Sequence, residues 1–176
     1  MSLRYKFNRA QTLVTALTPE ERADLRRICE TIQRSQENLL ANAGPAMRHC
    51  LRNCEGLCCR NAHVDDIIGL WDLVYILTLT PELADDIAAR VKGESPFYSA
   101  NCMFLKEDTG PCIFAAAIRP EVCVTTFCSG DRAIQKEIRR VKRAFFKIGC
   151  FFFWRRPRAL LKRLSRPARR GKPTAA

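Results

Sequence analysis

Hydrophobic residues recur at helical spacing over much of the chain, and this pattern predicts a mostly α-helical fold. After Thr18-Pro19-Glu20-Glu21, apolar residues follow at Leu25, Ile28, Ile32 and Leu39. The threonine is a typical N-cap, proline is favoured in a first turn, and Glu21 completes a capping box. We therefore predict a helix that begins at Pro19 and ends at Gly44-Pro45.

Two further helices are predicted in the middle of the chain. An apolar stretch from about Asp65 to Leu79 predicts one helix, and Thr80-Pro81-Glu82 predicts the start of a short one that closes near Gly93. Residues 94–130 are expected to be irregular because helix-breaking residues are spread along them. These residues are Pro96, Gly110, Pro111, Pro120 and Gly130.

The last predicted helix spans residues 131–154, with Asp131 as its N-cap. One face carries apolar residues at helical spacing: Ile134, Ile138, Val141, Phe145, Ile148 and Phe152. The other carries Lys136, Arg139, Arg140, Arg143 and Lys147. This amphipathic pattern predicts a helix packed on the domain through its apolar face. Pro157 is expected to interrupt it, leaving 155–176 as a basic, disordered tail.

Composition and charge refine this picture. The chain has 176 residues, of which 47% are hydrophobic and 27% charged, as in ordinary globular domains. The net charge of +12 is uneven, because residues 1–135 carry net −2 and residues 136–176 carry net +14. The charged start MSLRYKFNRAQ and the lack of a run of ~18 apolar residues predict neither a signal peptide nor a transmembrane segment. A cytoplasmic location is expected.

Ten cysteines are the most unusual feature of the composition. Cytoplasmic thiols stay reduced, so clustered cysteines there favour metal or cluster ligands over disulfides. Eight of them form two groups: Cys50-x3-Cys54-x3-Cys58-Cys59, and Cys102-x9-Cys112-x10-Cys123-x4-Cys128. Zinc and iron–sulfur clusters both take about four thiolates, so eight suit two sites, one cluster with spare thiols, or one site with a redox pair.

The motifs around these cysteines resemble those of YkgJ-like proteins, the CxxCxxCC family. The matching runs are CLRNCEGLCC (50–59), NCMFL (101–105), GPCIF (110–114) and RPEVCVTTFC (119–128). The resemblance implies a domain that chelates zinc or iron, with all eight cysteines as ligands. Two positions depart from the family: each gap in the first group is one residue longer, and Val124 stands where the family has arginine.

Other interpretations of the cysteines stay open. Small buried thiols can simply fill a core, and this is expected of Cys29 and Cys150, which stand outside both groups. A disulfide framework would require export. His49 and His63 flank the first group, and we expect both to lie outside the ligand set. Related modules occur in flagellin lysine methylases, so a protein-modifying or redox enzyme is an alternative, although no P-loop or dinucleotide motif is present.

These observations predict one mostly α domain of packed helices with a loop-rich cysteine metal site. The expected parts are an N-terminal helical segment (1–45), a cysteine-cluster region (46–130), the basic helix (131–154) and the tail (155–176). The positive charge of residues 136–176 favours an anionic partner, which is nucleic acid, an anionic membrane surface or an acidic protein. A zinc-stabilised module that binds through this region is therefore a further alternative.

Overall fold

The computed structural model describes residues 1–44, 64–93, 101–106, 111–126 and 131–164, and this part of the chain is mostly helical, as predicted. It contains no strand, only an isolated bridge between Leu105 and Cys112. The elements are α1 (Leu3–Thr15), α2 (Pro19–Asn42), α5 (Val64–Ile67), α6 (Leu70–Leu79), η1 (Pro81–Leu83), α7 (Ala84–Lys92), η3 (Ala116–Ile118), α8 (Glu121–Thr125) and α9 (Arg132–Leu164).

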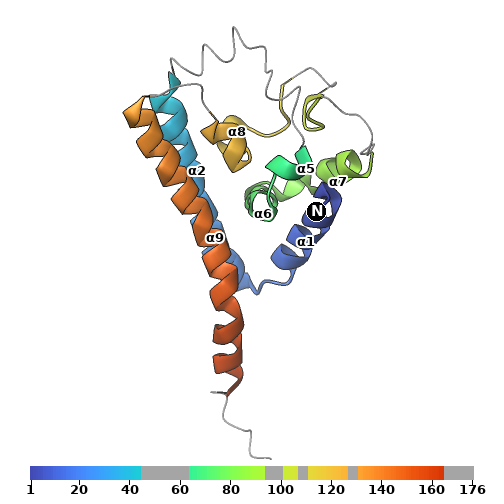
Figure 1. The fold of residues 1–176 in the computed structure, drawn as a ribbon. Helices are drawn as coiled ribbons and strands as arrows, with labels where there is room; N and C mark the ends of the chain where they lie inside the picture. Colours follow the sequence, from blue (N-terminus) through green and yellow to red (C-terminus); the bar gives the residue numbers. More distant parts are fainter. Residues whose placement is uncertain (45–63, 94–100, 107–110, 127–130, 165–176) are drawn as a thin grey trace, which may run out of the picture.

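Two long helices, α2 and α9, lie side by side, and the shorter helices pack beside them (Figure 1). α1 packs on α6, and α6 contacts both long helices. Consecutive residues of α6 from Asp72 to Thr78 are buried, as expected of a helix that is covered on all sides. Aromatic rings join it to α9: Tyr75 contacts Phe145 at a centroid distance of 5.0 Å, and Trp71 stacks on Phe152 at 5.5 Å.

The predicted start of α2 is confirmed in detail. The Thr18 hydroxyl accepts a hydrogen bond from the Glu21 backbone N–H at 3.3 Å. In return, the Glu21 carboxylate accepts from the Thr18 N–H at 3.0 Å. This reciprocal capping box satisfies two N–H groups that the first turn of a helix leaves without partners.

The middle of the chain differs from the prediction in two places. The helix expected over Asp65–Leu79 is divided at Gly69, because the Gly69 N–H donates to the Asp72 carboxylate at 2.8 Å and α6 begins afresh there. Thr80 was expected to cap the next helix. Its hydroxyl instead donates back to the Ile76 carbonyl at 2.8 Å, and a 3-10 turn precedes α7.

The sequence pattern did not locate α1 within the N-terminal helical segment. Leu3, Phe7 and Ala10 are buried, and their spacing of four and three residues is the signal of a helix with a narrow apolar face. The many charged residues between them obscured that pattern. The Ser2 hydroxyl caps this helix by accepting from the Tyr5 N–H at 3.3 Å.

α9 buries the predicted apolar stripe from Ile134 to Ile148, leaves Phe152 partly buried and exposes the predicted basic face. Its N-cap is also as expected, because the Asp131 carboxylate accepts from the Ala133 N–H at 2.8 Å. The helix does not end near Trp154, however, and continues through Pro157 to Leu164. A proline removes one N–H donor and tends to kink a helix, but it does not have to end it. Within the described residues, no helix is long and apolar enough to cross a membrane.

Candidate metal centre

The structure describes three of the eight predicted ligands: Cys102, Cys112 and Cys123. The other five lie outside the described residues, as do the two histidines near the first group. They are Cys50, Cys54, Cys58, Cys59, Cys128, His49 and His63.

Cys102 and Cys112 lie on the two sides of a short loop whose ends are joined by backbone hydrogen bonds. The Lys106 N–H donates to the Pro111 carbonyl at 3.0 Å, and the Ile113 N–H donates to the Phe104 carbonyl at 2.9 Å. Phe104 and Phe114, on the two sides of this loop, are both buried, with ring centroids 4.9 Å apart. The two rings anchor the loop in the core and leave both cysteines partly exposed beside it.

Cys123 lies on α8, and a buried carboxylate fixes the start of that short helix. The Glu121 N–H donates to one oxygen of Asp72 at 2.7 Å, and the Gly69 N–H donates to the other at 2.8 Å. Burial raises the pKa of Asp72 to about 6, although the two N–H donors act in the opposite direction. One side chain thus ties the start of α8 to the start of α6.

A second contact holds the carbonyl groups near Cys102. The Nη1 atom of Arg90, on α7, donates to the carbonyls of Met103 at 2.7 Å and Leu105 at 3.0 Å. Its Nε donates to Asp86 at 2.9 Å, one helical turn earlier. The planar guanidinium suits this arrangement because its donors point in fixed directions. Arg90 therefore fixes the loop to α7.

A third contact holds the chain between Cys112 and Cys123. The Tyr75 hydroxyl donates to the Ala117 carbonyl at 2.8 Å and lies 3.3 Å from the Gln36 side-chain oxygen. The Gln36 amide donates to the Arg119 carbonyl at 3.0 Å, and this glutamine is completely buried. Buried polar groups need such partners, so this pair fixes η3 against α2 and α6.

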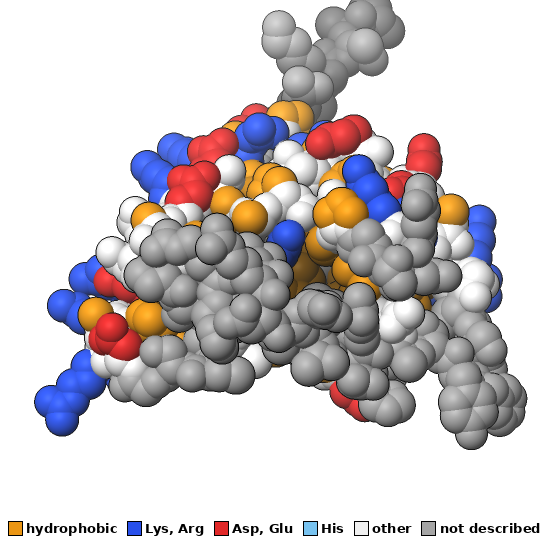
Figure 2. Space-filling model, turned by 90° about the horizontal axis from the view of Figure 1, so that it is seen from above, with side chains coloured by type: hydrophobic (Ala, Val, Ile, Leu, Met, Phe, Trp, Pro, Cys, Tyr) orange, Lys and Arg blue, Asp and Glu red, His pale blue; other side chains and the backbone are white. Residues whose placement is uncertain are grey.

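These contacts place Cys102, Cys112 and Cys123 around one cavity of about 340 Å³. Its wall is mostly apolar and combines α5, the loop and α8. The remaining lining residues are Val64, Ile67, Ile68, Leu105, Arg119, Val122 and Thr126. Seen from this end of the molecule, hydrophobic side chains reach the surface around a hollow (Figure 2).

The three cysteines share the cavity without forming a compact ligand set. In the part of the chain that the structure describes, no three His, Cys, Asp or Glu residues are grouped closely enough to hold a metal ion. Thiolates are suitable ligands for zinc and for iron–sulfur clusters, and three cysteines share this cavity. Either kind of site takes about four thiolates, which is more than these three cysteines supply. The remaining thiols of the predicted set lie outside the described residues.

Neither Cys29 nor Cys150 lines this cavity. Cys29 is completely buried on α2, and burial raises the pKa of its thiol to about 12. Val124, at the position where the resembled family has arginine, is buried in the core beside Cys123. At this position the side chain contributes to packing.

Sequence reasoning missed the residues that position the cysteines, namely Gln36, Asp72, Tyr75 and Arg90. One signal was present, since Asp72 is the single charged residue in the apolar run LWDLVYILTL. A lone carboxylate in a buried helix requires partners. Gln36 and Arg90 carry no such signal, because polar residues are ordinary on amphipathic helices.

Comparisons with protein-family models, with curated proteins and with solved structures found no match for this chain. The resemblance to YkgJ-like proteins therefore stays a prediction from the cysteine motifs.

Proposed function

We propose that this chain is a cysteine-cluster metalloprotein that binds zinc or an iron–sulfur cluster. The proposed ligands are Cys50, Cys54, Cys58, Cys59, Cys102, Cys112, Cys123 and Cys128. The supporting observation is that Cys102 and Cys112, from the two sides of one loop, line the same cavity as Cys123, from α8. The other ligands in this proposal come from the motif spacing and the family resemblance.

Two features of the cavity support this function. Its wall is mostly apolar, and surroundings of low polarity strengthen the electrostatic attraction between a cation and thiolates. Side chains of the helical body, namely Arg90, Tyr75 and Asp72, also fix the backbone of the segments that carry the three cavity cysteines. Ligands fixed in this way lose less conformational entropy when they bind a metal.

The bound group would determine the chemistry at this site. Zinc would stabilise the fold without redox activity, whereas an iron–sulfur cluster would transfer electrons. The residues of this chain would supply thiolates and hold them in place. Arg119, the one charged residue in the described wall, would add a positive charge near the thiolates and favour their ionised form.

The test is anaerobic purification of the full chain, followed by metal and sulfide analysis and a visible absorption spectrum. We expect either stoichiometric zinc with no colour, or iron and sulfide with visible absorption. A double variant, Cys112→Ala with Cys123→Ala, should lose most of the bound metal. Cys150→Ala is the matched control and should keep its full metal content.

Metal-free protein from several metal-supplemented preparations would overturn the proposal. Full metal content in the double variant would also contradict it, because the cavity cysteines would then not be ligands. Loss of metal in the Cys150→Ala control would show that the proposed ligand set is incorrect.

A further inference from the structure

The side of α9 that faces away from the body carries large exposed aromatic residues. Phe146 is 73% exposed, Phe153 is 71% exposed and Trp154 is 57% exposed. Only three other large hydrophobic residues are comparably exposed in the described part of the chain, and they lie elsewhere: Met1, Tyr5 and Ile67. Half of the exposed large hydrophobic residues described therefore lie on one helix.

The spacing of these aromatics places them together. Phe153 and Trp154 follow Phe146 by seven and eight residues, which is two helical turns, so all three lie on neighbouring parts of one side. The apolar stripe toward the body, from Ile134 to Ile148, lies on a different side of the helix. α9 thus presents a group of large aromatic residues to solvent between Phe146 and Trp154.

Basic residues accompany these exposed aromatics. Arg139 and Arg143 are exposed on the same side of α9, two turns and one turn before Phe146, and the exposed Lys147 directly follows it. We call Arg139, Arg143, Phe146, Lys147, Phe153 and Trp154 the outward face. Beyond it the chain stays basic, since residues 136–176 contain fifteen Lys and Arg residues and one acidic residue.

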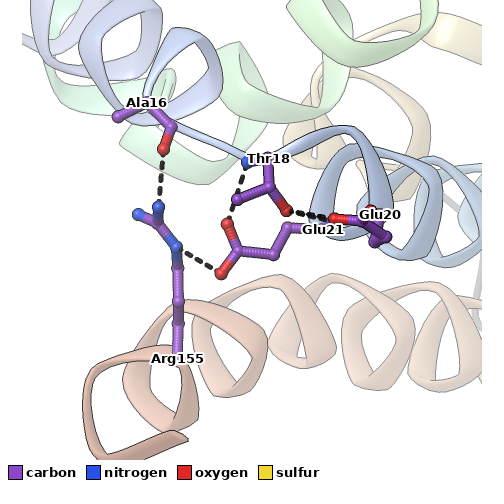
Figure 3. Close-up of polar contacts among 5 residues, drawn as sticks. All are labelled: Ala16, Thr18, Glu20, Glu21 and Arg155. Atoms are coloured by element: carbon purple, nitrogen blue, oxygen red, sulfur yellow. Dashed lines mark hydrogen bonds and ion pairs between the residues drawn. The ribbon is translucent and has the colours of Figure 1, made fainter. Parts of the chain in front are cut away.

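An ion pair fixes the rotation of α9 about its own axis. Arg155 Nε lies 2.9 Å from a Glu21 carboxylate oxygen, and its Nη2 donates to the Ala16 carbonyl at 2.6 Å (Figure 3). Glu21 is itself held by the capping box at the start of α2. Because Arg155 points toward the body, its neighbours Phe153 and Trp154 remain on the outside. Beyond this contact, α9 extends past the loop that joins α1 and α2 (Figure 1).

We infer that the outward face of α9 docks on an anionic lipid membrane. A helix that lies in the headgroup region places aromatic rings at the boundary with the acyl chains, while Lys and Arg side chains extend to the lipid phosphates. Charge complementarity favours this partner, since basic residues near an anionic leaflet are attracted to its lipid phosphates. This inference does not depend on the proposed metal centre.

Two other partners fit the outward face less well. A second copy of the chain would bring two strongly basic helices together, and their like charges would repel. Nucleic acid would satisfy the positive charge, and aromatic rings can stack on unpaired bases, but such rings line a basic groove that follows the strand. Here the rings stand on the convex surface of one helix, and a lipid interface accommodates rings and cations in that arrangement.

The test measures binding of the full chain to sedimented vesicles of phosphatidylcholine, with and without phosphatidylserine, at low and high salt. We expect binding to the phosphatidylserine vesicles that weakens with salt but persists in part, because salt does not remove the apolar contribution. A triple variant, Phe146→Ser, Phe153→Ser and Trp154→Ser, should bind at least about tenfold more weakly. Tyr5→Ser, an exposed aromatic on α1, is the matched control and should bind like the wild type.

A second variant tests the cations. Replacing Arg139, Arg143 and Lys147 by glutamine should reduce binding most strongly at low salt. Circular dichroism should show unchanged helix content in both variants, because the substituted side chains are exposed. Absence of binding to phosphatidylserine vesicles would overturn the inference, and so would equal binding of the triple aromatic variant. Binding to RNA or DNA that is abolished by salt, without vesicle binding, would assign the outward face to nucleic acid instead.

Discussion

The helical body and the cysteine-bearing segments, residues 101–106 and 111–126, are held in place by different interactions. Helices such as α2, α6 and α9 satisfy their own backbone hydrogen bonds and pack through apolar side chains. The cysteine-bearing segments have little regular structure of their own. Their backbone groups are fixed by side chains of the body, chiefly Arg90, Tyr75 and Asp72.

This difference separates global stability from the local order of the candidate site. Apolar burial in the body should determine the free energy of unfolding, because that term grows with buried area. A few polar contacts should determine how well the three cysteines of the cavity are positioned, because each contact fixes a short stretch of backbone. Loss of an apolar contact in the body should therefore lower the free energy of unfolding. Loss of a polar contact to the cysteine-bearing segments should instead change their local order.

The largest effect is expected in the body, at adjacent phenylalanines on α9. Phe145 is buried against Tyr75, whereas the next residue, Phe146, is exposed to solvent. Phe145→Ala should lower the free energy of unfolding by about 3–5 kcal/mol through the cavity it leaves. Phe146→Ala, the matched control, should change it by less than about 0.5 kcal/mol. Urea denaturation followed by circular dichroism measures both, and similar losses in the two variants would contradict the packing described for α9.

An intermediate effect is expected at Asp72, which joins the body to α8. Burial raises its pKa from 3.8 to about 6 in the folded state, so the folded protein binds the proton more tightly than the unfolded chain does. Its contribution to stability is therefore greatest below pH ~4 and is lost as the pH rises through 6. A shift of this size corresponds to roughly 3 kcal/mol.

The matched variant is Asp72→Asn, which cannot titrate. We expect the free energy of unfolding of the wild type to fall relative to that of the variant as the pH rises from 4 to 7. Urea denaturation at several pH values measures this difference. Parallel pH profiles for the two proteins would show that the Asp72 carboxyl titrates normally and is not held as the structure describes it.

The sequence predicted the body better than the cysteine-bearing segments because the two follow different rules. A capping box such as Thr18 to Glu21 and a stripe such as Ile134 to Ile148 are local patterns, and local patterns are visible in a sequence. The break at Gly69 was missed because it depends on a hydrogen bond that Asp72 makes across one turn. The continuation past Pro157 was missed because proline weakens a helix without necessarily ending it.

The cysteine motifs identified candidate ligands, but no spacing rule could show what holds them. The contacts from Gln36 to Arg119 and from Tyr75 to Ala117 join residues far apart in the sequence. A polar residue on a helix can face solvent or contact a distant carbonyl, and the residue type alone does not show which of these it does. The shared cavity of Cys102, Cys112 and Cys123 likewise depends on tertiary contacts.

The smallest effect on global stability, but a distinct local one, is expected at Arg90. Arg90→Lys keeps the positive charge but loses the planar group that contacts Met103, Leu105 and Asp86 together. Two hydrogen bonds to backbone carbonyls would be weakened, so residues 101–106 should open more often. We expect hydrogen exchange there to become about three- to tenfold faster, while the free energy of unfolding falls by less than about 1 kcal/mol.

The control for this prediction is Arg26→Lys on α2. Arg26 also pairs with an acidic residue four positions away, Glu30, but both side chains are largely exposed and the structure records no contact from Arg26 to the cysteine-bearing segments. Hydrogen exchange measured by mass spectrometry should be unchanged over residues 101–106 in this variant. If Arg90→Lys leaves exchange there unchanged as well, the loop is held by Phe104 and Phe114 in the core. Cys102 would then be positioned by apolar packing, as the helices of the body are, and not by polar contacts.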